Sequence, residues 1–110
     1  MAYLGGLILC LSLMLCAAPL RAETLRLATW HAGLERDGPG MLLRDLAGDD
    51  DPQAAAVVRV LVALDADVLL LRGVDYDAGS AALTALQDRL AASGAGYPHR
   101  FALPPNTGVP

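Results

Sequence analysis

Residues 65–77, with the sequence DADVLLLRGVDYD, decide the fold of this chain. The run Val68–Leu71 is continuously apolar, which is too short for a helix and too uniform for a strand with one face in water. Such a run is typical of a strand that is covered on both faces inside a parallel sheet. The glycine and acidic residues after it mark the carboxyl end of the strand, where open α/β sheets place their ligand sites. We therefore expect a functional site near Gly73–Asp77.

The segments before this run predict a strand, a short helix and a longer helix. Alternating side chains predict a strand at Thr24–Trp30, and the long connection His31–Asp51 holds a short helix at Met41–Leu46. Asp51 is expected to cap the longer helix, because Pro52 is favoured in the first helical turn. The apolar face of that helix and its direct step into the next strand predict a parallel crossover.

A second amphipathic helix and a third strand are predicted beyond the acidic turn. Ser80 is expected to cap this helix and Gly94 to end it. Because Pro98 breaks the helical pattern, His99–Leu103 is interpreted as a short third strand. The order strand, short helix, helix, strand, helix, strand gives an α/β fold. Two helices leave one face of so apolar a sheet uncovered, so we expect the front of a larger domain.

The first segment has the layout of a secretory signal peptide. The apolar run Leu4–Leu15 is followed by Pro19 and by a small-residue cleavage site that ends at Ala22. We expect residues 1–22 to be removed and the remaining chain to be secreted or periplasmic. The alternative is an uncleaved membrane anchor, because the stretch up to Leu20 carries no charged side chain and approaches spanning length.

Composition limits the partners of the chain. Cys10 and Cys16 both lie in that first segment, so residues 23–110 have no cysteine for a disulfide or a thiolate metal site. The formal net charge is −4 and there is no lysine, so general electrostatics do not favour a nucleic acid. We therefore expect a nucleic acid to be a poorer partner than a small phosphate ester, with a basic remainder of the domain as the route by which one could still bind, and we expect no membrane partner once the first segment is cleaved. A phosphate ester would need a bound cation or single well-placed arginines.

An ordered series of short motifs resembles one enzyme family. In chain order, the motifs are Thr29–His31, Gly38–Asp45, Asp51–Gln53, Asp67–Leu71, Asp75–Asp77, Tyr97–Phe101 and Pro105–Gly108. Together they resemble a secreted bacterial branch of the endonuclease/exonuclease/phosphatase family, over nearly all of residues 23–110. The resemblance implies the truncated amino-terminal part of a four-layer α/β sandwich. Such enzymes hydrolyse phosphate mono- or diesters with Mg²⁺ or a similar divalent cation.

The resemblance also implies which positions carry the chemistry. In the family the first strand ends in an Asn that helps to hold the phosphate, and the second ends in Gln-Glu, whose Glu binds the metal. His31 stands at the Asn position, and Arg72 and Gly73 stand at the Gln-Glu position. Glycine has no side-chain ligand, and the later Asp-x-Asn and Asp-His motifs are expected beyond Pro110. We therefore expect an inactive phosphoesterase. The alternatives are a non-catalytic module that binds a phosphate ligand or a partner, and a truncated product that does not fold stably.

Three residues are the candidates for a site. His31 would donate to a phosphate or bind a metal weakly, and the alternative is a partly buried histidine bonded to a loop carbonyl. Asp75, with Asp77 two residues later, would replace the missing Glu as a metal ligand, unless both form a turn that bonds its own backbone. Arg72 would hold a phosphate oxygen with two donors, unless it pairs with Asp75.

Overall fold

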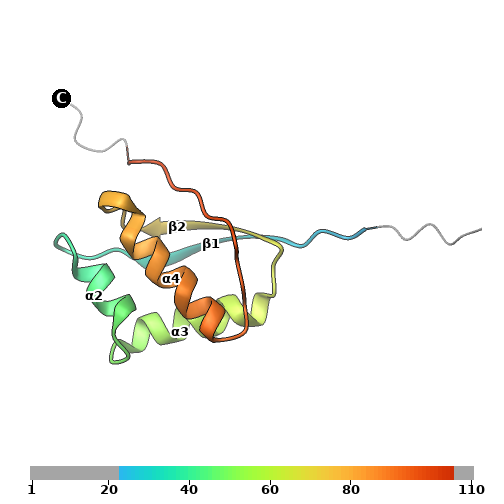
Figure 1. The fold of residues 1–110 in the computed structure, drawn as a ribbon, viewed down its shortest axis with the longest axis horizontal. Helices are drawn as coiled ribbons and strands as arrows, with labels where there is room; N and C mark the ends of the chain where they lie inside the picture. Colours follow the sequence, from blue (N-terminus) through green and yellow to red (C-terminus); the bar gives the residue numbers. More distant parts are fainter. Residues whose placement is uncertain (1–22, 106–110) are drawn as a thin grey trace, which may run out of the picture.

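The described chain is a small α/β domain with a two-stranded parallel sheet. The structure is a computed structural model that describes residues 23–105. Its elements are β1 (Leu27–Leu34), α2 (Met41–Ala47), α3 (Pro52–Leu64), β2 (Val68–Val74), the 3₁₀ turn η1 (Ala78–Ser80) and α4 (Ala81–Ala92). β1 and β2 pair in parallel, and the three α-helices lie on one side of them (Figure 1). This arrangement confirms the predicted α/β class and the predicted parallel crossover.

The crossover helix α3 begins and ends as the sequence predicts. Pro52 opens the helix, and the Asp51 carboxylate accepts a hydrogen bond from the backbone N–H of Ala54 at 2.8 Å. Asp65 ends the helix in the left-handed region, with φ of 45°. The left-handed residue Asp65 stops the helix, so the chain enters β2 almost directly. The apolar face of α3 packs toward the sheet.

The core lies between the sheet and the three helices. Its largest fully buried side chains are Leu34, Leu46, Leu61 and Leu86, one each from β1, α2, α3 and α4. Trp30, Leu69 and Leu71 pack against this core from the sheet. Burying a leucine stabilises the fold by roughly 1.5–3 kcal/mol, so each helix contributes at least one strong contact to the same cluster.

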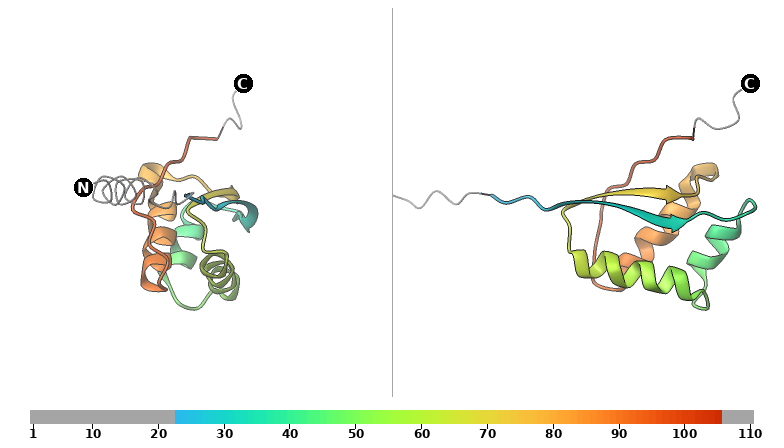
Figure 2. Two further views of the ribbon diagram at one scale, coloured as in Figure 1. Left: turned by 90° about the vertical axis from the view of Figure 1, so that its right-hand side faces the viewer. Right: turned by 180° about the vertical axis from the view of Figure 1, so that it is seen from behind.

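In the described part of the chain, Val68–Leu71 is covered on one face and not on both, and one uncovered face of the sheet is what the small number of helices predicts. Leu69 and Leu71 pack against the core, but Val68 and Leu70 are 51% and 61% exposed. The two views in Figure 2 show α2, α3 and α4 on the same side of the sheet, so no described helix covers the other side. Because the described sheet has two strands, β1 and β2 are both edge strands. We call the uncovered side of β2, together with that of β1, the open face.

β1 begins and ends later than predicted. It runs from Leu27 to Leu34, because its partner β2 begins only at Val68, opposite Leu27. Residues 24–26 therefore precede the strand. An irregularity after His31 places one more residue on β1 than on β2, and Gly33 within it has φ of 65°. His31 is thus a strand residue and does not belong to the following loop.

α4 is capped by a different residue than predicted. Ser80 makes no side-chain hydrogen bond to the helix, and its backbone is left-handed with φ of 53°. The Asp77 carboxylate instead accepts from the backbone N–H of Ala82 at 3.0 and 3.1 Å. A carboxylate is a stronger acceptor than a hydroxyl and is favoured at the positive end of a helix. Asp77 therefore has a structural partner.

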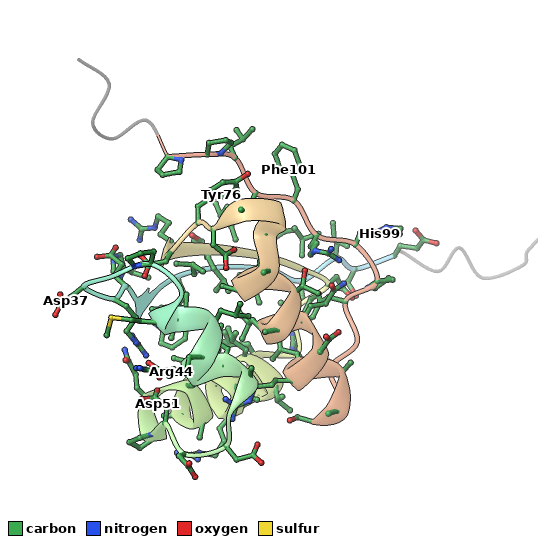
Figure 3. All side chains as sticks on the ribbon, turned by 60° about the vertical axis from the view of Figure 1, so that its left-hand side comes forward. Asp37, Arg44, Asp51, Tyr76, His99 and Phe101 are labelled. Atoms are coloured by element: carbon green, nitrogen blue, oxygen red, sulfur yellow. The ribbon has the colours of Figure 1, made fainter. Side chains whose placement is uncertain are left out.

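The predicted third strand does not form within residues 23–105. Residues 99–103 run past α4 without joining the sheet, and Phe101, labelled in Figure 3, is 82% exposed. The segment is held by Arg100, whose Nη1 donates to Oε1 of Gln87 on α4 at 2.9 Å. A cavity of about 800 Å³ is lined by β2, α4 and this segment. Arg100 therefore ties this segment to α4. The outer edge of β2 has no strand partner within residues 23–105.

Some predictions fall on residues outside the described range. The predicted signal peptide, residues 1–22, and residues 106–110 are among these. Within residues 23–105 there is no helix with the length and apolar character needed to span a membrane. The predicted secreted or periplasmic location of the protein therefore stays a prediction.

Candidate functional site

The carboxyl half of the open face brings together two of the predicted site residues. His31 of β1 and Arg72 of β2 are partners in the parallel register. Both are exposed, whereas their neighbours Trp30 and Leu71 pack against the core. Side chains alternate along a strand and neighbouring strands lie about 4.8 Å apart. His31 and Arg72 are therefore adjacent on the same face.

Arg72 has its donors available for a ligand. It forms no ion pair and no side-chain hydrogen bond with any residue in the range 23–105. The expected alternative, a pair with Asp75, does not occur there. A guanidinium presents several N–H donors in one plane and matches two oxygens of a phosphate. Arg72 is thus suited to bind an oxyanion at this position.

His31 lies across β2, over a residue that has no side chain. Its side chain is 56% exposed, and Nε2 lies 3.9 Å from Oε1 of Glu35, so the alternative of a partly buried histidine is wrong. A Cβ at residue 73 would lie 2.7 Å from Nε2 and 2.9 Å from Nδ1 of the ring. These distances are shorter than van der Waals contact. The imidazole therefore occupies this place because residue 73 is Gly73, whose φ is 69°.

Asp75 is engaged in the fold and is not placed as a free metal ligand. Its Oδ2 accepts a hydrogen bond from the backbone N–H of Arg36 at 2.7 Å, which joins the end of β2 to the loop after β1. Asp77, two residues later, caps α4. Residues 23–105 contain no group of three or more His, Cys, Asp or Glu side chains that would share a cation. Mg²⁺ is held by one or two carboxylates together with other oxygen ligands, so the cation that the family resemblance implies stays a prediction.

Arg36 organises the loop after β1, and sequence reasoning missed it. Its side chain is only 12% exposed, and Nε donates to Oδ2 of Asp45 at 2.8 Å while Nη2 lies 3.3 Å from Oδ2 of Asp51. The bond from Arg36 is the main reason that the pKa of Asp45 lies below its usual value. The signal in the sequence was the position of Arg36, in a connection that leads to two helices. Asp45 lies in the first of these helices, and Asp51 caps the second. Gln53 adds a bond to the carbonyl of Gly33 at 2.6 Å, which holds the bulge of β1.

Comparison with known proteins adds no relative to this picture. No protein-family model, curated protein or solved structure matches the chain. The likeness to the endonuclease/exonuclease/phosphatase family therefore stays a prediction from short motifs. The geometry of His31 and Arg72, and the engagement of Asp75, carry the functional argument.

Proposed function

We propose that this protein binds a phosphate-bearing small molecule at His31 and Arg72 and does not hydrolyse it. The proposal depends on one observation, the exposed cross-strand pair in which Arg72 has no partner within residues 23–105. An imidazole and a guanidinium side by side offer N–H donors to two oxygens of the same phosphate. This is the non-catalytic alternative that the sequence left open.

The packing of His31 on Gly73 favours binding over metal-dependent hydrolysis. A carboxylate at residue 73 would need the space that the imidazole fills. The nearest acidic residue after β2, Asp75, accepts a backbone hydrogen bond instead. We propose that the protein is a secreted or periplasmic derivative of a phosphoesterase scaffold and represents the amino-terminal part of a four-layer sandwich. The ordered motifs and the parallel crossover support this assignment.

Titration of the full chain with ethyl phosphate tests the proposal, with NMR or calorimetry as the measurement. Arg72→Gln is expected to weaken binding about tenfold or more, because a hydrogen bond to a charged group contributes roughly 1.5–3 kcal/mol. The matched control is Arg59→Gln, which removes an exposed arginine from α3 on the other side of the sheet. The control is expected to leave the affinity unchanged.

Two further measurements separate binding from hydrolysis. Glu35→Gln is expected to strengthen ethyl phosphate binding, because it removes a negative charge 3.9 Å from the imidazole of His31. No binding by the parent chain, or equal losses in Arg72→Gln and Arg59→Gln, would contradict the proposal.

With Mg²⁺ and bis(p-nitrophenyl) phosphate we expect no turnover. Magnesium-dependent turnover that Asp75→Ala abolishes would show a hydrolase with Asp75 as a ligand.

A further inference from the structure

One carboxylate stands beside the two donors of the proposed phosphate site. Oε1 of Glu35 lies 3.9 Å from Nε2 of His31, and the Glu35 side chain is 66% exposed. Within residues 23–105 this carboxylate forms no other ion pair and accepts no hydrogen bond. A carboxylate at this position repels a phosphate and attracts a cation. The site therefore has a place for positive charge on the ligand.

The fold fixes the backbone on both sides of this carboxylate. Before Glu35, the bulge bends β1, and Gln53 of α3 donates to the carbonyl of Gly33 at 2.6 Å. After Glu35, the backbone N–H of Arg36 donates to Oδ2 of Asp75 at 2.7 Å. The Glu35 side chain is exposed, but it projects from a backbone that two other segments hold in place. Its position at the edge of the site is therefore a product of the fold.

Charge balance favours a ligand that carries both signs. Arg72 supplies one positive charge and Glu35 one negative charge, and the whole chain has a formal net charge of −4. A phosphate monoester carries about −1.5 to −2 charges at pH 7. An ammonium group on the same ligand would pair with Glu35 and would also lower the repulsion between the ligand and an acidic protein. Opposite charges stabilise each other within about 4–6 Å, which a short alkyl linker between phosphate and ammonium can span.

We propose that the ligand of this site is an aminoalkyl phosphate, with its phosphate at His31 and Arg72 and its ammonium group at Glu35. This inference rests on the proposed function, since the phosphate is the one assigned there. The three side chains belong to the carboxyl halves of β1 and β2 and to the loop after β1. The ligand therefore needs no contact with the apolar part of the open face. Charge complementarity fixes its orientation, because the donors and the carboxylate stand on different residues.

The test compares phosphoethanolamine with ethyl phosphate on the full chain, by calorimetry or NMR titration. The two ligands have the same phosphate and the same carbon chain and differ by the ammonium group. At about pH 8 both phosphates are dianions, because their second pKa is about 6. We expect phosphoethanolamine to bind about threefold more tightly, an effect typical of one exposed ion pair. The preference is expected to shrink in about 1 M NaCl, where charges are screened beyond about 3 Å.

Three variants assign the preference to its residue. Glu35→Gln is expected to remove it, by weakening the binding of phosphoethanolamine and strengthening that of ethyl phosphate. The matched control is Asp37→Asn, which removes an exposed negative charge from the same loop (Figure 3) and is expected to keep the threefold preference. Arg72→Gln is expected to weaken both ligands by the same factor, because it acts on the phosphate that they share.

The outcomes distinguish this inference from the proposed function. Equal affinities of the parent chain for the two ligands, or tighter binding of ethyl phosphate, would overturn the aminoalkyl phosphate and leave the phosphate site in place. No binding of either ligand would overturn both proposals. A preference that survives in Glu35→Gln, or that is lost equally in Asp37→Asn, would attribute the effect to the general charge of the chain and overturn the inference.

Discussion

The two faces of the sheet are built from the same apolar strand, yet only one of them is packed. On β2, Leu69 and Leu71 contact the core, while Val68 and Leu70, which alternate with them, are exposed. Nothing in the residue types distinguishes the two pairs. The difference comes from where the three helices lie, all on one side (Figure 2). An apolar strand therefore indicates that both faces can be covered, but the number and placement of helices decide which face is covered.

The polar groups at the carboxyl end of the sheet show the same contrast. Near the helices, Arg36 is almost buried and contacts both Asp45 and Asp51. On the open face, Arg72 has no ion pair within residues 23–105, and His31 has only a distant contact with Glu35. Charges of the packed face stabilise the loop after β1. Charges of the open face are available to a ligand.

The largest expected effect separates the packed face from the open face. Leu61→Ala is expected to lower the free energy of unfolding by about 2–5 kcal/mol, because Leu61 is fully buried and its removal leaves a cavity. Leu70→Ala, at a residue that is 61% exposed, is expected to change it by about 0.5 kcal/mol or less. Urea denaturation followed by circular dichroism measures both. Similar losses would mean that the open face is covered in solution.

A smaller effect tests the packing of His31 on β2. Gly73 and Gly79 both have φ of 69°, but only at residue 73 would a Cβ meet another residue, the imidazole of His31. Each glycine-to-alanine change is expected to cost about 1–2 kcal/mol of stability, because the left-handed backbone disfavours a side chain. Only Gly73→Ala is expected to displace the ring, because only there would the new Cβ meet it. Imidazole NMR shifts of His31 measure this. Equal shifts in both variants would contradict the arrangement.

The smallest effect concerns the anchor between the turn that precedes β2 and the segment after α4. Tyr97 donates a hydrogen bond to the carbonyl of Ala66 at 2.8 Å. Burial, followed by the charges of Asp65 and Asp67, raises the pKa of Tyr97. The folded state therefore keeps this proton while the unfolded state, with a pKa of about 10, loses it. The stabilisation is complete below about pH 10 and is lost as the pH rises through the pKa of the folded state.

Tyr97→Phe separates the hydrogen bond from the titration. At neutral pH the variant is expected to be less stable by about 1 kcal/mol, the net contribution of one hydrogen bond. Above about pH 10 the difference from the parent is expected to shrink, because the variant has no phenol to ionise. The midpoints of urea denaturation, measured from about pH 7 to about pH 11, test this, because that range brackets the reference pKa of tyrosine. A constant difference over that span would contradict the raised pKa.

Local pattern determined the elements and the crossover that joins the two strands. Asp51 and Pro52 set the start of α3, and the run Val68–Leu71 forms a strand, because caps, proline geometry and hydrophobic period act over a few residues. The short helix at Met41 was predictable for the same reason. The sequence placed His31 and Arg72 at the ends of the two strands, whereas the structure pairs them inside β1 and β2, which continue to Leu34 and Val74.

Tertiary structure alone decided which groups are satisfied and which are free. Asp75 has the residue type and position of a metal ligand, but the backbone N–H of Arg36 reaches it from a loop 39 residues away in sequence. His31 lies on Gly73 because two strands pair in one register. The open face exists because three helices share one side of the sheet. Such outcomes depend on contacts between distant segments, and local residue patterns contain no information about them.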